Sequence, residues 1–209
     1  LQCKNHAEVK IAENAGDVTS SYFVGGIAGA AMSASEFKEN YNYGSLVQAT
    51  PVNMLYMGGV AGYAFAPISK CENHGSLSAN AAASAYNLGG VAAQGVAMNG
   101  NTNYGAISTL NMAPAADAVS GTSVLRIGGV AAHATTTVED AFAAGGDDSA
   151  TFENNKNYGT IRSLASTFTG EIMCIAGVLG QANIPISNCY NYHAPGTDKD
   201  AIDIYVGGT

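Results

Sequence analysis

A short pattern that recurs six times constrains the fold of this chain more than any single residue does. Each copy reads Cys or Asn, any residue, Asn, then His or Tyr, as in Cys71-Glu72-Asn73-His74. The landmark asparagines of the copies are Asn5, Asn42, Asn73, Asn103, Asn157 and Asn191. A repeat of roughly thirty residues with fixed landmarks is typical of a solenoid, a propeller or an array.

A second pattern, an apolar residue followed by Gly-Gly and then Ile or Val, follows each copy. Its occurrences are Val24-Gly25-Gly26-Ile27, Met57-Gly58-Gly59-Val60, Leu88-Gly89-Gly90-Val91, Ile127-Gly128-Gly129-Val130, Ile175-Ala176-Gly177-Val178 and Val206-Gly207-Gly208. Between the landmarks, short stretches alternate apolar and polar residues and are bounded by Gly or Asn, which predicts short β-strands. We therefore expect an all-β chain with three short strands per repeat, stacked as a right-handed parallel β-helix.

The repeats predict one β-solenoid domain over residues 1–209, with about six repeats that start near residues 1, 37, 68, 98, 152 and 186. Two insertions, 111–122 and 134–150, interrupt the spacing between Asn103 and Asn157. Thr136 and Glu139 have capping-box spacing, so we expect a short helix in the second insertion. The chain opens inside one repeat and stops just after a Gly-Gly pair, so we expect it to be a fragment of a longer chain.

The landmark asparagines are expected to point inward at a corner of each coil. An Asn side chain carries donors and an acceptor, so it can bond the turning backbone and the asparagines of the neighbouring coils. Asn also tolerates the left-handed backbone angles that corners require. The Gly-Gly pairs lack the spacing of a nucleotide-binding loop, and Gly within a strand instead permits close approach of a neighbouring group.

Composition excludes several classes of protein. The chain is 47% hydrophobic and 11% charged, which is too apolar for disorder. A net charge of −8 and a pI near 4.7 argue against nucleic acid or anionic membrane as partner, because both attract cationic surfaces. No apolar run approaches the ~18–20 residues of a membrane span. We expect no membrane insertion, no cofactor and an extracellular or cell-surface location.

The four cysteines are expected to remain free thiols. Cys3, Cys71 and Cys189 hold the same position in the first, third and sixth copies, and Cys174 lies beside a Gly-rich strand. With neighbouring coils ~4.8 Å apart, Cys3 and Cys71 would lie about 10 Å apart, beyond the ~7 Å limit for a disulfide.

An aromatic column is the first candidate binding surface. Tyr43, Tyr104 and Tyr158 hold the position after the landmark Asn, as Tyr192 does in the last copy. A column of stacked rings either binds sugar rings or covers a corner of the core, and the sequence leaves both interpretations open.

The insertion 134–150 is the second candidate surface. Inserted loops of repeat proteins project on one face and often form the binding site. Asp140, Asp147 and Asp148 are the candidate residues there, either as ligands of a partner or of calcium, or as a solvated acidic turn. No catalytic or metal-binding constellation is recognisable elsewhere in the sequence.

The order of the two patterns resembles the GLUG repeat. The stretches that carry the resemblance are Met57-Gly58-Gly59-Val60-Ala61-Gly62-Tyr63 with Ile68-Ser69-Lys70-Cys71-Glu72-Asn73-His74-Gly75, and Ile186-Ser187-Asn188-Cys189-Tyr190-Asn191-Tyr192. It covers nearly the whole chain and departs at Ala176 and at His193-Ala194-Pro195-Gly196. Such repeats occur in adhesins and other large bacterial surface proteins, including those of gut Bacteroidetes. The resemblance implies a scaffold at the cell surface and supplies no catalytic residues.

These observations favour a non-catalytic cell-surface or secreted module that binds a glycan or a host surface protein and is joined to other domains of its parent chain. One alternative is a polysaccharide lyase or glycosidase on a β-helix, and another is the accessory repeat region of a secreted metallopeptidase. Carbohydrate-active enzymes need clustered carboxylates, or carboxylates with Arg and Lys. Arg126 and Arg162 are the only arginines, and acidic residues do not recur at matched positions.

Overall fold

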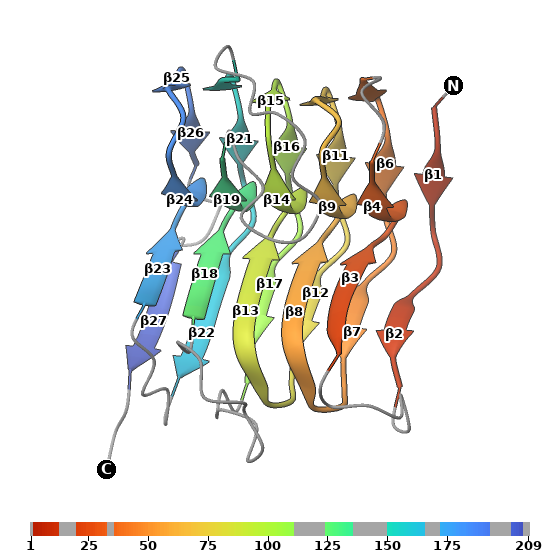
Figure 1. Ribbon diagram of the computed structural model, residues 1–209, viewed down its shortest axis with the longest axis vertical. Helices are drawn as coiled ribbons and strands as arrows, with labels where there is room; N and C mark the ends of the chain where they lie inside the picture. Colours follow the sequence, from red (N-terminus) through yellow and green to blue (C-terminus); the bar gives the residue numbers. More distant parts are fainter. Residues whose placement is uncertain are drawn as a thin grey trace.

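The computed structural model describes residues 2–12, 20–32, 36–110, 124–135, 150–165, 172–192 and 202–206. Over these residues the fold is all-β, with 27 strands in five parallel sheets and no helix. Each repeat contributes one strand to each sheet in a fixed order, and we name the sheets A to E in that order. Strands of successive repeats lie side by side, from the red to the blue end of the chain (Figure 1).

Sheets A and B carry the first two strands of each repeat. Sheet A contains β1 (Lys4–Asn5), β6 (Tyr41–Asn42), β11 (Glu72–Asn73), β16 (Thr102–Asn103), β21 (Lys156–Asn157) and β26 (Tyr190–Asn191). Sheet B contains β2 (Val9–Ile11), β7 (Leu46–Gln48), β12 (Leu77–Ala79), β17 (Ile107–Thr109), β22 (Ile161–Ala165) and β27 (Ile202–Val206). Every landmark Asn is therefore the last residue of a sheet A strand.

Sheets C, D and E complete each repeat. Sheet C contains β3 (Ser21–Gly25), β8 (Val52–Gly58), β13 (Ala83–Gly89), β18 (Val124–Gly128) and β23 (Ile172–Ala176). Sheet D contains β4 (Ala28–Ala31), β9 (Ala61–Ala64), β14 (Ala92–Gly95), β19 (Ala131–Ala134) and β24 (Leu179–Ala182). Sheet E contains β5 (Phe37–Lys38), β10 (Ile68–Ser69), β15 (Met98–Asn99), β20 (Phe152–Glu153) and β25 (Ile186–Ser187).

The complete repeats have five strands, so the expectation of three was wrong. The Gly-Gly pair separates sheet C from sheet D, because the chain turns so tightly there that a Cβ on Gly58 would lie 2.0 Å from the carbonyl oxygen of Ala61. A second break separates sheet E from sheet A at a residue with φ between 51° and 68°. These residues are Glu39, Lys70, Gly100, Asn154 and Asn188. The left-handed backbone thus falls three residues before five of the six landmark asparagines, from Asn42 to Asn191, and the landmark asparagines do not adopt it.

The apolar core has two parts. One lies between sheets B and C and includes Leu46, Leu77 and Leu88, while the other lies beneath sheets D and E and includes Ile68 and Phe152. Between them, five of the six landmark asparagines, from Asn42 to Asn191, face the glycine at the second Gly position of the apolar-Gly-Gly pattern. The facing glycines are Gly26, Gly59, Gly90, Gly129 and Gly177. We call this narrow zone the waist.

The sheet E strands begin at residues 37, 68, 98, 152 and 186. Most of the two insertions, and the helix expected from Thr136 and Glu139, lie outside the described residues. No helix of membrane-spanning length and hydrophobicity occurs in the described part of the chain.

Candidate functional site

The landmark asparagines form a hydrogen-bonded row along sheet A. The Nδ2 of each Asn donates to the Oδ1 of the next at 2.8 Å. The same Nδ2 donates at 2.7 to 2.9 Å to the carbonyl oxygen two residues later in its own turn. In four of these turns the backbone N–H two residues after the Asn donates to the Asn Oδ1 at 3.1 to 3.2 Å. Because these bonds occupy the interior side chains, the row holds turns together and offers no groups to a ligand.

The residues two positions before the landmark asparagines form a second row, which contains three of the four cysteines. Cys71 is fully buried, and its Sγ accepts the backbone N–H of Asn40 at 3.4 Å. Burial raises the pKa of the Cys71 thiol to about 11, so it is a poor nucleophile. Cys3 and Cys189 hold the same position at the two ends of the stack, with asparagines between them, and all four cysteines are free.

The aromatic column is a continuous stack of rings on the outside of the fold. Neighbouring ring centroids are 4.6 to 5.1 Å apart, and the ring planes differ by 5° to 16°. In order, the rings belong to His6, Tyr43, His74, Tyr104, Tyr158 and Tyr192. Tyr43 and Tyr104 are 42% and 45% exposed.

This geometry does not suit the column as a sugar platform. Sugars stack on the open face of an aromatic ring, but both faces of Tyr43, Tyr104 and Tyr158 are covered by the neighbouring rings of the column. Only ring edges and hydroxyl groups reach solvent. Offset stacking of this kind contributes about 0.5–1.5 kcal/mol per pair, so we assign the column to packing between repeats.

The acidic candidates Asp140, Asp147 and Asp148 lie outside the described residues. Among the residues that are described, no three His, Cys, Asp or Glu side chains gather as metal ligands would.

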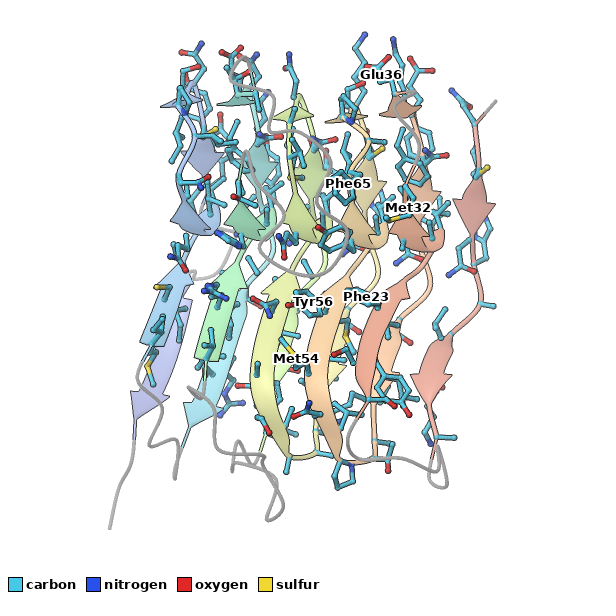
Figure 2. The ribbon with its side chains drawn as sticks, viewed as in Figure 1. Phe23, Met32, Glu36, Met54, Tyr56 and Phe65 are labelled. Atoms are coloured by element: carbon cyan, nitrogen blue, oxygen red, sulfur yellow. The ribbon has the colours of Figure 1, made fainter. Side chains whose placement is uncertain are left out.

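A surface that the sequence did not single out lies where the outer face of sheet C meets that of sheet D. Phe23 on β3 stacks on Tyr56 on β8 with centroids 5.0 Å apart, as Figure 2 shows on neighbouring strands. Tyr63 on β9 approaches both edge-on, at 5.6 and 6.4 Å, and Phe65 lies 5.6 Å from Tyr63. Phe23 is 39% exposed. We call these four residues the aromatic cluster.

A polar cluster continues the same surface into the next repeats. Asn87 and Arg126 follow Tyr56 in register along sheet C, and Gln94, His133 and Gln181 follow Tyr63 along sheet D. The Arg126 guanidinium bridges the two sheets, since its Nε donates to Gln181 Oε1 and its Nη1 donates to Asn87 Oδ1 at 3.3 Å. We call these five residues the polar corner.

His133 is held neutral in the polar corner. Burial, together with the positive charge of Arg126, lowers the pKa of His133 to about 4 from an ordinary value of 6.5. At neutral pH the ring therefore keeps one N–H donor and one free lone pair.

This shift predicts a loss of stability in acid. The unfolded chain takes up a proton on His133 near pH 6.5, whereas the folded chain does so only near pH 4. The stability that the neutral imidazole contributes is therefore fully present above pH 6.5 and is lost as the pH falls toward 4. NMR titration of the imidazole should give the low value directly. In urea unfolding followed between pH 7 and pH 4, His133→Gln should flatten the decline. An NMR titration midpoint near 6.5 would contradict the prediction.

A positional signal for this surface was present in the sequence. Its sheet C residues stand directly before the apolar-Gly-Gly pattern, and its sheet D residues stand four after the second Gly. The sheet C position holds Phe23, Tyr56, Asn87, Arg126 and Cys174, and the sheet D position holds Ala30, Tyr63, Gln94, His133 and Gln181, so both vary more than the apolar-Gly-Gly pattern beside them. Variable large residues beside a constant framework are the signal that would have identified them.

A further hollow lies at the turn between sheets E and A. Its lining residues are Gly100, Thr102, Asn154, Lys156, Asn188 and Tyr190. All of them are exposed or half-buried, so this hollow lacks the buried polar groups found at the polar corner.

Comparisons with known proteins leave the chain without an assigned family: no family model, no curated protein and no solved structure matches it.

Proposed function

We propose that this chain is a non-catalytic module of a bacterial surface or secreted repeat protein, built as a right-handed parallel β-helix of GLUG-type repeats. In this proposal the module binds a saccharide on the surface formed by the aromatic cluster and the polar corner. The parallel register of all five sheets supports the β-helix, and the order of the sequence landmarks supports the family.

The observation that carries the binding proposal is an aromatic surface beside hydrogen-bonding groups on a rigid scaffold. Phe23, on the end strand of sheet C, is 39% exposed, and Asn87 and Gln94 lie on later strands of sheets C and D, next to Tyr56 and Tyr63. Saccharide sites combine these elements, because C–H faces pack on aromatic rings while hydroxyl groups bond to amides. Regular strands hold such groups in place better than loops do.

The proposal predicts that Phe23→Ala weakens saccharide binding by about tenfold, because an aromatic ring that a ligand covers is a typical hot spot. The purified chain is first applied to an array of bacterial, plant and host saccharides, and the best ligand is then measured by calorimetry. Tyr104→Ala is the matched control, since it removes an equally exposed ring from the column. It should leave affinity within about twofold.

Two outcomes would overturn the proposal. If no saccharide on the array binds, the module is not a glycan binder. If Tyr104→Ala abolishes binding while Phe23→Ala does not, the column is the site and the surface between sheets C and D is not.

A polysaccharide lyase is the competing function with an observation in its favour. His133 is buried, neutral and next to Arg126, as a proton-abstracting base beside a cation would be. Incubation of the chain with the acidic polysaccharides that it binds, followed by absorbance of unsaturated products, separates the two. Product that accumulates with time and disappears in His133→Gln would establish the enzyme.

A further inference from the structure

Among the described residues, the Arg126 guanidinium of the polar corner has no carboxylate partner. Arg126 is half-buried, and the two acceptors that it contacts, Gln181 and Asn87, are neutral amides. Within the described residues, the ion pairs are Lys38 with Glu36 and His74 with Glu72, and neither involves this guanidinium. Removing a charge from water without a partner is costly, so an anion beside the buried part of the guanidinium would be stabilising.

The same corner holds hydrogen-bonding groups that are not used. Asn87 is 1% exposed, and its Nδ2 makes no hydrogen bond among the described residues. Gln94 and His133 beside it are each 8% exposed. Buried polar groups in native proteins are nearly always paired, and each unpaired group costs about 1–3 kcal/mol. The unused groups of this corner include the two N–H bonds of the Asn87 amide.

The charge of the polar corner suits a ligand group with a single negative charge. Because His133 is neutral near pH 7, Arg126 contributes the only formal charge among the five residues of the polar corner. A guanidinium together with amide N–H groups is a donor set that suits a carboxylate. This set stands out in a chain with a net charge of −8.

The strand register of sheet C gives the separation between the aromatic cluster and Arg126. Tyr56, Asn87 and Arg126 lie on three consecutive strands of sheet C, and Phe23 precedes them on the next strand. At ~4.8 Å per strand, the backbone of Arg126 is about 10 Å from that of Tyr56 and about 14 Å from that of Phe23 along the sheet. An oligosaccharide can span this separation, so one ligand can place a ring on the exposed part of the aromatic cluster and an acid group at Arg126.

We propose that the polar corner binds the carboxylate of an acidic saccharide, with Arg126 and the Nδ2 of Asn87 as donors and the aromatic cluster beneath the sugar ring. The inference rests on the proposed saccharide binding and specifies its ligand class. The carboxylate belongs either to an internal uronate or to a terminal sialate, and both present the same group to the corner.

The test is a calorimetric titration of the purified chain with oligogalacturonate and with sialyllactose. Their neutral partners, the methyl-esterified oligogalacturonate and lactose, are titrated in parallel. At least one acid should bind about tenfold or more tightly than its neutral partner, since a charge-assisted pair contributes that much. Whichever acid binds identifies the source of the carboxylate.

Arg126→Gln should reduce the affinity for the acid about tenfold while leaving the affinity for the neutral partner unchanged. Arg162→Gln is the matched control, because Arg162 is the only other arginine and is exposed on sheet B. It should change neither affinity. If thermal melting shows that Arg126→Gln does not fold, Arg126→Lys replaces it and should weaken binding of the acid through loss of the bidentate fork.

The two proposals fail in different ways. If the acids and their neutral partners bind equally and Arg126→Gln has no effect, saccharide binding stands and the carboxylate assignment falls. If inorganic sulfate displaces the acid at equal concentration, the corner is a general anion site and the assignment also falls. If no saccharide binds in any arm, the proposed function itself is wrong.

Discussion

Gly90→Ala should destabilise the fold by at least about 3 kcal/mol, at the upper end of the range for overpacked cores. A Cβ on Gly90 would lie 1.9 Å from the carbonyl oxygen of Gly129 and 2.3 Å from Cγ of Asn103. Backbone lies on one side and a buried hydrogen-bonded side chain on the other, so neither neighbour can move without breaking its own bonds. Urea unfolding of the variant against the parent chain measures the loss.

Two controls separate lack of space from a general intolerance of change at glycine. Gly100→Asn should be nearly neutral, because Asn154 and Asn188 adopt the same left-handed backbone at this repeat position. At Gly177 the three nearest atoms to a new Cβ all belong to Asn191, at 2.5 to 2.8 Å. Asn191→Ala should therefore restore part of the stability lost in Gly177→Ala. A parent-like midpoint for Gly90→Ala would refute the close packing at the waist.

Asn103→Ala should cost about 3 kcal/mol, because several buried groups lose a partner at once. Its Nδ2 donates to Gly105 O and Asn157 Oδ1, and its Oδ1 accepts from Gly105 N and from Asn73 Nδ2. Removing the amide interrupts the row in the middle of the stack, where water does not reach. Thermal melting should show a decrease in Tm of about 6–12 °C for a chain of this size.

Asn99→Ala is the matched control for this prediction. Asn99 lies one strand earlier, is exposed, and accepts one hydrogen bond from Asn154 at 3.0 Å. Exposed hydrogen bonds of this kind contribute little, so its melting temperature should stay close to that of the parent. Equal shifts for the two variants would mean that the landmark row does not stabilise the fold.

The predictions for Gly90 and Asn103 concern two residues that face each other across the waist. The landmark asparagines from Asn42 to Asn191 need a glycine on the opposite side of the waist, because only a residue without a Cβ leaves room for the amide. The Asn side chain also stabilises the turn that follows it, by hydrogen bonding to the backbone of that turn. This mutual requirement explains why both patterns recur together in the sequence.

Periodic features of the fold were predictable from the sequence. Parallel strands in register follow from landmarks that recur in the same order in every copy, and the inward position of the landmark row follows from Asn at a fixed position among them. Such features depend on residues within one repeat and on the identical residues of the next. The number of strands was not predictable in the same way, because the turn at Gly58 and the left-handed backbone at Lys70 divide stretches that read as continuous.

The sequence by itself determined an all-β chain in which each repeat adds one layer, since a periodic pattern needs only its own repetition to specify stacking. Tertiary structure alone decided where the distinctive chemistry gathers. Arg126 and Gln181 are 55 residues apart and belong to different sheets, yet the turn at the Gly-Gly pair brings the two faces together. It also decided that the rings of the column cover one another, because the stacking distance of the strands equals that of aromatic rings.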